Sequence, residues 1–346
     1  MNEKSAIDHE GLIRILFGAS AFNLLRAAHK LGLFDLLRSR GPLSDDDLAS
    51  ALGLQQRPVQ ILLLGTTSLG LTVRAGQGFA NSVLIDEMVA DCTWEIIEDI
   101  IDFESEIVGP AAGDLLESLR QNTNVGLNRI PGEGTDLYHR LSAHPDLEAL
   151  FYRCMRSWSR LSNPILVGKS DLTAVHRVLD VGGGDAVNAI ALAQANPNVS
   201  FTVVDMPGAL EFAEEKIRVS GLADRIRVEA GDIFSDDYPA GHDCVLFANQ
   251  LVIWSGEQNV RLLRKAYQCL PVGGQVLIFN AFSSDSGDGP LYAALDNVYF
   301  ATLPSGNSTI YPWRDHEKWL AEAGFRDAER LPGDTWTPHG VLRAWK

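Results

Sequence analysis

The sequence predicts an α/β protein in which a doubly wound domain follows an all-α domain of winged-helix type. From residue 175 onward, strand-like and helix-like segments alternate, which is typical of a parallel sheet covered by helices on both faces. Before that, helical segments followed by two short extended pieces fill residues 11–89. The length of 346 residues also exceeds what one ordinary core fills, so we expect more than one domain.

The N-terminal region shows the order helix, helix, helix and hairpin. Apolar residues recur at helical spacing between Ile13 and Leu37. Ser44 precedes three aspartates, which predicts the N-cap of a second helix. A third helix is expected over residues 58–69, followed by extended pieces around Gly76. This third helix carries no charged residue and is poorly suited to phosphate contacts, so we interpret the region as a dimerisation module rather than a DNA-binding one.

Residues 93–160 are expected to be helical, and their first part is acidic. Apolar positions between Ile96 and Phe103 form a stripe flanked by acids, which we interpret as a packed face beneath a solvated charged face. These acids are Glu95, Glu98, Asp99, Asp102 and Glu104. A further helix is expected over residues 147–158, and its apolar stripe is interpreted as part core and part pocket wall.

Composition and charge exclude several classes of function. The formal net charge of −16 argues against a nucleic-acid partner but not against a small cationic ligand. No apolar run approaches the roughly 20 residues of a membrane span, and the polar start at residues 1–5 lacks the apolar core of a signal peptide. Four widely spaced cysteines show no zinc-binding pattern. We therefore expect a cytoplasmic protein with no metal, membrane or nucleic-acid partner.

The elements of the alternating region follow one another in order. Strands are expected at residues 177–181, 200–204, 226–228, 244–247 and 275–279. Helices are expected at residues 186–194, 208–219 and 258–270. Ligands of such sheets bind at the carboxyl edge of the strands, so residues that directly follow a strand are the first candidates for a site.

A glycine-rich loop ends the first of these strands, in the run DVGGG at residues 180–184. Glycines such as Gly182 and Gly184 let the backbone turn sharply and approach a ligand. A dinucleotide fingerprint needs a third glycine where Val187 stands, so that motif is absent. Asp180, ahead of the glycines, suits a cationic ligand with an amino group better than a pyrophosphate. The motif favours S-adenosylmethionine (SAM).

Two further acids follow the next strands. Asp205 ends the second strand, where a carboxylate can accept both ribose hydroxyls. Asp232 comes just past the third strand and is placed to accept the adenine amino group, with Ile233 and Phe234 against the ring. A lone acid at a strand end is weak evidence, but three in order after successive strands form a strong signal for SAM.

These residues resemble the small-molecule O-methyltransferases of the caffeic acid and hydroxyneurosporene type. The matching segments are residues 178–184, 204–207, 231–234 and 320–325 and, in part, 251–257. The helix with Phe151 and Met155 is similar to the family's Phe…Met-x-x-x-Ser segment, which borders cofactor and substrate and here ends at Ser159. The resemblance extends over nearly the whole chain and implies a Rossmann-like methyltransferase domain behind a winged-helix domain that forms a homodimer.

The resemblance also implies a division of the chain and a set of site residues. It implies a dimerisation domain at residues 1–92, a helical connector contributing to the substrate pocket at 93–160, and a SAM-binding domain at 161–346. The implied cofactor contacts are Ser159, Asp180, Gly182, Gly184, Asp205, Met206, Asp232, Ile233, Phe234 and Asn249. The implied acceptor pocket contains Phe151, Met155, Val252, Trp254, Asp296, Tyr299 and Phe300.

The chain departs from the family pattern where the family's catalytic histidine stands. The family reads Leu-His-Asp-Trp-Ser-Asp-Glu, whereas residues 251–257 read LVIWSGE. Val252 takes the histidine position and cannot accept a proton, and Ile253 replaces the neighbouring acid. The family's supporting acids would fall near Asn280 and Ile310, so they too are missing.

Glu257 is the one acid of this segment that the chain keeps. Ser255 followed three residues later by Gln258 predicts a capping box, so we interpret Glu257 as a helix-start residue. The catalytic residues therefore stay unassigned. Substitute bases by residue type are Tyr138, His144, Asp296, Tyr299, Tyr311 and His339.

Methyl transfer can proceed without a dedicated base. Holding the nucleophile about 3 Å from the methyl group is worth roughly 7–11 kcal/mol in favourable cases, and a general base adds roughly 10²–10⁴-fold. We expect a methyltransferase that acts on a small aromatic or polyketide-like secondary metabolite, with O-methylation favoured over C- or N-methylation. The alternative is a SAM-binding enzyme repurposed for hydroxylation, decarboxylation or cyclisation.

Overall fold

The computed structural model describes residues 7–346, so the polar start at residues 1–5 lies outside the described residues. The chain forms two compact units, and the boundary in the sequence falls between Asp102 and Phe103. Each unit has its own hydrophobic core. The predicted division at residues 92 and 160 stays a prediction.

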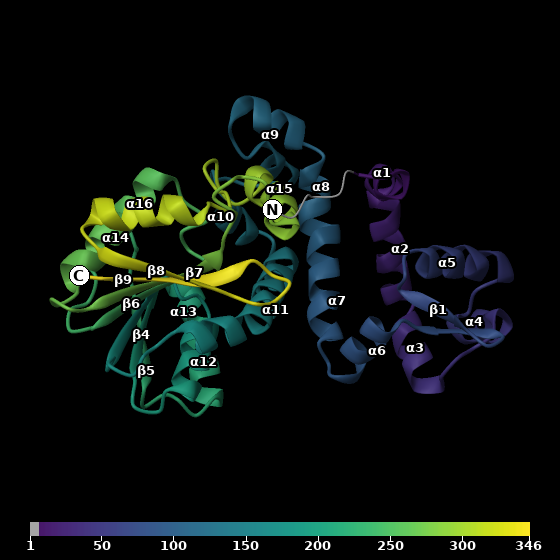
Figure 1. The fold of residues 1–346 in the computed structure, drawn as a ribbon, viewed down its shortest axis with the longest axis horizontal. Coiled ribbons are helices and arrows are strands. Elements are labelled where there is room, and N and C mark those ends of the chain that lie inside the picture. The colour runs from purple at the N-terminus through teal and green to yellow at the C-terminus, as the bar shows by residue number, and fades with distance from the viewer. Residues whose placement is uncertain (1–6) are drawn as a thin grey trace. The chain divides into compact units, whose positions relative to one another are not determined.

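The first unit contains short helices and one hairpin (Figure 1). Its elements are α1 (His9–Leu16), α2 (Gly18–Lys30), α3 (Leu33–Arg40), α4 (Asp45–Leu52), α5 (Gln56–Ser68), β1 (Thr72–Ala75), β2 (Gly78–Asn81), α6 (Val83–Ala90) and α7 (Trp94–Phe103), which ends at the boundary. Five helices precede the hairpin instead of three, because the chain breaks at Phe17 and again at Gly32, whose φ is 70°. Ser44 caps α4 by accepting the amide N–H of Asp47 at 3.2 Å, as predicted.

The second unit is built on a seven-stranded mixed sheet. In sheet order its strands are β5 (Ile226–Ala230), β4 (Ser200–Asp205), β3 (Arg177–Val181), β6 (Cys244–Ala248), β7 (Gln275–Ala281), β9 (His339–Trp345) and β8 (Arg326–Pro332). The five predicted strands are confirmed and are parallel to one another. The sheet contains two further strands that the sequence did not predict, and β9 runs antiparallel to both β7 and β8.

Helices of the second unit cover both faces of this sheet and extend from one end of it. They are η1 (Glu104–Val108), α8 (Gly109–Ala112), α9 (Leu115–Gln121), η2 (Val125–Arg129), α10 (Leu137–Leu141), α11 (Pro145–Lys169), α12 (Val187–Ala195), α13 (Pro207–Val219), α14 (Gly256–Cys269), α15 (Leu291–Thr302) and α16 (Trp313–Ala323). The helix expected over residues 147–158 is the first half of the longer α11.

Alternate residues of the strands enter two separate cores. Val178 and Val203 pack with α11, α12 and α13, whereas Leu179 and Val204 pack with α14 and α16 on the other face (Figure 1). This doubly wound arrangement leaves the carboxyl ends of the parallel strands uncovered by these helices, and every strand-end residue predicted for the site lies there.

In the part of the chain that the structure describes, no single helix is both long and apolar enough to cross a membrane. The bent pair α1 and α2 meets the length and composition criteria only when the two helices are taken together. The predicted cytoplasmic location stays a prediction.

Candidate functional site

The glycine loop after β3 adopts a conformation that requires glycine. Gly182 has a φ of +69° and Gly184 a φ of +56°. The N–H of Gly182 donates to Val204 O at 2.8 Å, and its carbonyl accepts Gln250 Nε2 at 2.8 Å. A Cβ added at Gly182 would lie 2.5 Å from the Gln250 side chain. The loop is therefore held between β4 and the segment after β6 in a form that a larger residue disrupts.

We expect Gly182→Ala to lower the melting temperature by several degrees and to weaken SAM binding at least about tenfold. The change adds left-handed strain of about 1–2 kcal/mol to a collision costing about 1–3 kcal/mol. Gly184→Ala is the matched control, since it adds the same strain but meets nothing within 4 Å. Calorimetric titration with SAM and thermal melts check both; equal losses in the two variants would contradict the role of the Gln250 contact.

Asp180 lies beneath the loop rather than at its rim. Its side chain is 0% exposed, and neither carboxyl oxygen has a hydrogen-bond partner among the described residues. A Cβ at Gly183 would come within 2.7 Å of Oδ2. Burial, helped by the charge of Asp205, raises the pKa of Asp180 to about 7. A buried carboxyl without a partner is a destabilising arrangement that a cationic ligand can relieve.

Asp205 joins the end of β4 to the glycine loop. Its Oδ2 accepts the N–H of Gly184 at 2.8 Å, and Oδ1 accepts the N–H of Met206 at 2.7 Å. Burial raises its pKa, and these two hydrogen bonds oppose the rise. Each oxygen keeps further acceptor capacity, so the carboxylate can still receive two hydroxyl donors.

Asp232 organises the turn after β5. Its Oδ1 accepts the N–H groups of Phe234 at 2.7 Å and Ser235 at 3.2 Å. Lys265 Nζ donates to Ile233 O at 2.7 Å and so ties the turn to α14. The turn places the Phe234 ring edge-on to Trp254, with centroids 4.9 Å apart. Asp232 thus has a structural role in addition to the adenine contact predicted for it.

The remaining predicted cofactor residues lie at the same edge or on the helix beside it. Asn249 follows β6, has a φ of +56°, and donates its N–H to Phe279 O at 2.7 Å. Ser159 is buried on α11, one turn before Asn163, whose Nδ2 donates to Val187 O at 3.4 Å where α12 begins. The sheet therefore brings the predicted strand-end residues to one edge, and their roles in binding stay predictions.

Aromatic side chains predicted for the acceptor pocket form a cluster with Phe103 and Tyr138. Phe103 lies 6.2 Å from Phe151 and 5.5 Å from Tyr299 by ring centroids, and Tyr138 lies 5.8 Å from Phe151. Tyr299 in turn meets Phe300 at 5.0 Å. Tyr152 lies 5.6 Å from Phe151 and 5.5 Å from Phe212 on α13, the helix after Asp205, so the cluster reaches the cofactor edge.

Val252 and its neighbours provide no proton acceptor. The Val252 side chain is 4% exposed, and its carbonyl accepts the N–H of Thr309 at 2.9 Å. The carbonyl of Trp254 accepts the Tyr311 hydroxyl at 2.9 Å. The predicted capping box of Ser255 and Gln258 is confirmed at the start of α14. Glu257 lies in the first turn of that helix, as interpreted.

Most of the substitute bases suggested by residue type are unsuited to that role. Burial raises the pKa of Tyr138 and Tyr299 further above neutrality and lowers that of His339 to about 4. His144 Nε2 is 2.7 Å from Pro131 O. The exception is Asp296, whose pKa is raised to about 7 by burial and by the charge of Glu104.

Glu104 is the residue that sequence reasoning missed. The sequence pattern assigns it to a charged face, where it is partly exposed like Asp99 and Asp102, but burial raises its pKa to about 7. Glu104 opens η1, a π-helical turn, and such turns occur frequently at functional sites. Neither Glu104 nor Asp296 forms an ion pair or hydrogen bond with any residue that the structure describes.

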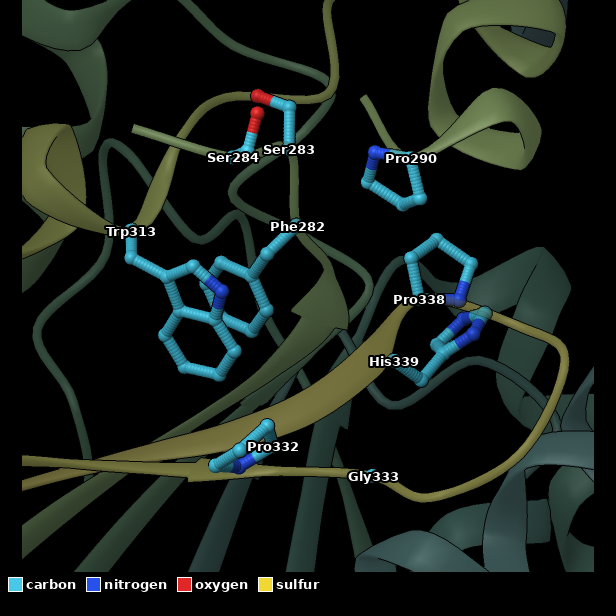
Figure 2. Close-up of a pocket in the computed structure, with 9 residues that line it drawn as sticks. All are labelled: Phe282, Ser283, Ser284, Pro290, Trp313, Pro332, Gly333, Pro338 and His339. Carbon is cyan, nitrogen blue, oxygen red and sulfur yellow. The ribbon is translucent and has the colours of Figure 1, made fainter. Parts of the chain in front are cut away.

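A separate pocket lies further along the same edge, beyond β7. Its volume is about 220 Å³. Figure 2 shows Phe282 and Trp313 stacked in its wall, with ring centroids 3.6 Å apart, and His339 opposite them. His339 is one of the bases considered above, but none of the predicted cofactor or acceptor residues lines this pocket.

Comparison with protein families gives two matches on this chain. Residues 113–326 match an O-methyltransferase domain, and residues 13–84 match an O-methyltransferase dimerisation domain.

Individual proteins similar to the chain include two curated bacterial enzymes and one solved structure. L-tyrosine C(3)-methyltransferase of Streptomyces lavendulae is 49% identical over 99% of this chain and 94% of its own length. 3-Hydroxy-5-methyl-1-naphthoate 3-O-methyltransferase of Streptomyces sahachiroi is 30% identical over 93% and 91%. The apo crystal structure of the S-adenosylmethionine-dependent methyltransferase SibL matches with a TM-score of 0.90 and 54% identity over 98% of this chain and 99% of that one.

Proposed function

From the premise that the chain belongs to the O-methyltransferase family and is a SAM-dependent methyltransferase of small molecules, we propose that it methylates a ring carbon of a tyrosine-like phenol. The observation that carries the proposal is Val252, an apolar residue where the resemblance places the base. The tyrosine C(3)-methyltransferase that is 49% identical to the chain supports the choice of acceptor and of carbon.

The chemistry of the acceptor explains why a valine suits this position. In O-methylation the attacking atom is the oxygen that loses the proton, so the base must stand beside the point of attack. In methylation at C3 the attacking atom carries a hydrogen and is bonded to the carbon that bears the hydroxyl. An apolar neighbour such as Val252 then suits the attacking atom, and the base is needed a few ångströms away.

The chain's residues hold the two reactants in place. SAM supplies the methyl group as an electrophilic sulfonium. The residues around the glycine loop fit it, since Asp180 is buried without a partner and Asp205 presents unused acceptor capacity. The rings of Phe103, Phe151 and Tyr299 give the acceptor a flat, largely apolar site. Orientation of this kind supplies much of the acceleration in bimolecular transfer.

The first unit supports a homodimer as the working form. The matched dimerisation domain begins at residue 13. α1 buries none of its own residues, and Ile13, Ile15 and Leu16 on it are exposed. Large exposed apolar side chains on one short helix are typical of a surface that a partner covers.

A deuterium-release assay tests the proposed function. L-Tyrosine deuterated at both ring carbons next to the hydroxyl-bearing carbon is incubated with the protein and SAM, and the product is analysed by mass spectrometry. Methylation at C3 replaces one deuterium with the methyl group, whereas O-methylation keeps both. We expect a product with one deuterium together with S-adenosylhomocysteine.

The contrary outcomes of this assay are distinct. A methylated product that retains both deuteriums would support O-methylation, which was favoured from the sequence. SAM binding without S-adenosylhomocysteine formation, for tyrosine and for ring-hydroxylated relatives alike, would contradict the proposed acceptor class.

A further inference from the structure

We propose that Glu104 and Asp296 together form the catalytic base, which accepts the proton of the acceptor's phenol. The inference rests on the proposed function and deepens it by assigning the proton acceptor that Val252 cannot supply. It rests on the place of the two carboxyls in the fold and on the residues around them. It rests also on the absence of a hydrogen-bond or ion-pair partner for either carboxyl among the described residues.

The two carboxyls come from elements that the fold packs together. Glu104 opens η1, which continues directly into α8, and α15 with Asp296 packs against α8 and η2. Each carboxyl is partly exposed although it lies within the body of the second unit. Phe103, directly before Glu104, and Tyr299, one turn of α15 after Asp296, have ring centroids 5.5 Å apart, so the two carboxyls come from adjoining segments. The charge of Glu104 also contributes to raising the pKa of Asp296.

The pair borders the aromatic acceptor pocket. Phe103, directly before Glu104, packs edge-on against Tyr299, which lies one turn of α15 beyond Asp296. The charges of both carboxyls act on Tyr292 and on Tyr299, and Tyr138 also acts on Tyr299. Ring contacts also lead from Phe103 to the cofactor edge. Phe103 lies 6.2 Å from Phe151, whose neighbour Tyr152 lies 5.5 Å from Phe212 on α13, the helix that follows Asp205.

Within residues 7–346, no cation forms an ion pair with either carboxyl or contributes to its raised pKa. The titratable groups on which the charges of the pair act are Tyr292 and Tyr299 on α15, and these two tyrosines also interact with Cys154 on α11 and, for Tyr299, with Tyr138 on α10. Burial raises the pKa of all three tyrosines, so they stay protonated and neutral near pH 7. A structural carboxyl in such a place is normally paired with an arginine, lysine or hydrogen-bond donor, and among the described residues neither member of this pair is.

The pair is matched to proton transfer near neutral pH. Burial raises the pKa of both carboxyls to about 7. Two adjacent like charges disfavour each other, so near neutral pH the pair holds about one proton and can accept a second. A base with a pKa near the working pH is the most effective one.

The protons and electrons balance over the reaction. The pair takes the phenolic proton, and the electrons of the O–H bond make the neighbouring ring carbon nucleophilic. That carbon forms a bond to the methyl carbon as the methyl–sulfur bond breaks, and the sulfur keeps the electron pair. The oxygen then regains its proton from the pair, which frees the pair to accept the proton that the ring carbon loses as aromaticity is restored. One proton per turnover passes on to solvent.

Glu104→Gln and Asp296→Asn test the inference, with Glu106→Gln as the matched control. Glu106 lies two residues along in the same π-turn and is exposed. With L-tyrosine we expect kcat to fall about 10²–10⁴-fold in each test variant and to stay unchanged in the control. In Glu104→Gln the acidic limb of the remaining activity should move to lower pH, because Asp296 then lacks a like-charged neighbour. If the role of Glu104 were purely structural, the acidic limb of the pH–activity profile would stay where it is in wild type.

Two further measurements distinguish a base from other roles. Tyrosine with ring fluorine, whose phenol is more acidic, should restore much of the lost rate in the variants. In complexes of enzyme, S-adenosylhomocysteine and fluorotyrosine, wild type should show the red-shifted phenolate absorption at a lower pH than the variants do. S-Adenosylhomocysteine affinity, measured by calorimetry, should be equal in all four proteins and shows that the variants are folded.

The outcomes that overturn the inference differ from those that overturn the function. If the variants raise KM for tyrosine but keep the kcat and pH profile of wild type, the pair anchors the ammonium group and is not the base. If the variants keep all parameters, the pair has no part in the reaction. In both cases the proposed function would stand if wild type still replaces one ring deuterium with the methyl group. If wild type does not replace a ring deuterium, the proposed function itself is overturned.

Discussion

Asp205→Ala is expected to raise the dissociation constant for SAM by about 10²–10⁴-fold. Two hydroxyl hydrogen bonds to a charged acceptor are worth about 1.5–3 kcal/mol each, and about 1.4 kcal/mol corresponds to a tenfold change in affinity. The variant also loses the acceptor for the N–H groups of Gly184 and Met206. Calorimetric titration with SAM and with S-adenosylhomocysteine measures the loss for both ligands.

Two companion variants make this result specific. Asp205→Asn keeps one acceptor oxygen in place and should lose less affinity than the alanine variant. Asp224→Ala removes an exposed carboxyl from the loop before β5 and should bind as wild type does. Unchanged affinity in Asp205→Ala would show that the ribose is bound elsewhere.

Asp180→Asn is expected to stabilise the ligand-free protein at pH 8 and yet to weaken SAM binding at least about 100-fold. The folded pKa of Asp180 is about 7, above its ordinary value of 3.8. Its contribution to stability is therefore complete below about pH 4 and is lost as the pH rises through 7. Asparagine has no charge to bury, so the variant escapes this loss, but it leaves the cationic group of the ligand without its counter-charge.

Thermal melts between pH 5 and 8, with and without SAM, measure both effects. At pH 8 we expect the ligand-free variant to melt at least about 3 °C above wild type, since 1 kcal/mol moves the melting temperature by about 2–4 °C for chains of 150–250 residues. At pH 5 the difference should be smaller, because only the part of the loss between about pH 4 and pH 5 has then occurred. A variant that melts below wild type at pH 8 would show that the Asp180 carboxylate is stabilised by a partner when it ionises.

The cofactor edge was predictable from the sequence because its signals are local. A strand followed by glycines, and an acid at the end of each next strand, depend on residues near one another in the chain. Asp180, Asp205 and Asp232 accordingly lie where expected, at the ends of β3, β4 and β5. The capping box at Ser255 was equally readable, because its two members are three residues apart.

Glu104 was not predictable, and the reason is geometric. Up to Phe103 the acids follow α-helical periodicity, which predicts one charged face. The π-turn at Glu104 adds a residue to the turn and rotates the side chain out of that register. Its partner Asp296 is 192 residues away in the sequence. No pattern in a single sequence indicates that two such carboxyls meet.

The strand order has a consequence for how the second unit forms. β9, the last strand along the chain, pairs with β7 on one side and β8 on the other. The seven-stranded sheet therefore cannot be completed during synthesis until residues 339–345 have left the ribosome. Until then β7 presents an unpaired edge whose seven residues are all apolar or buried in the finished fold, and such edges attract other chains. In the nascent protein β7 is thus a segment exposed to aggregation, and it neighbours β6, the strand that Asn249 directly follows.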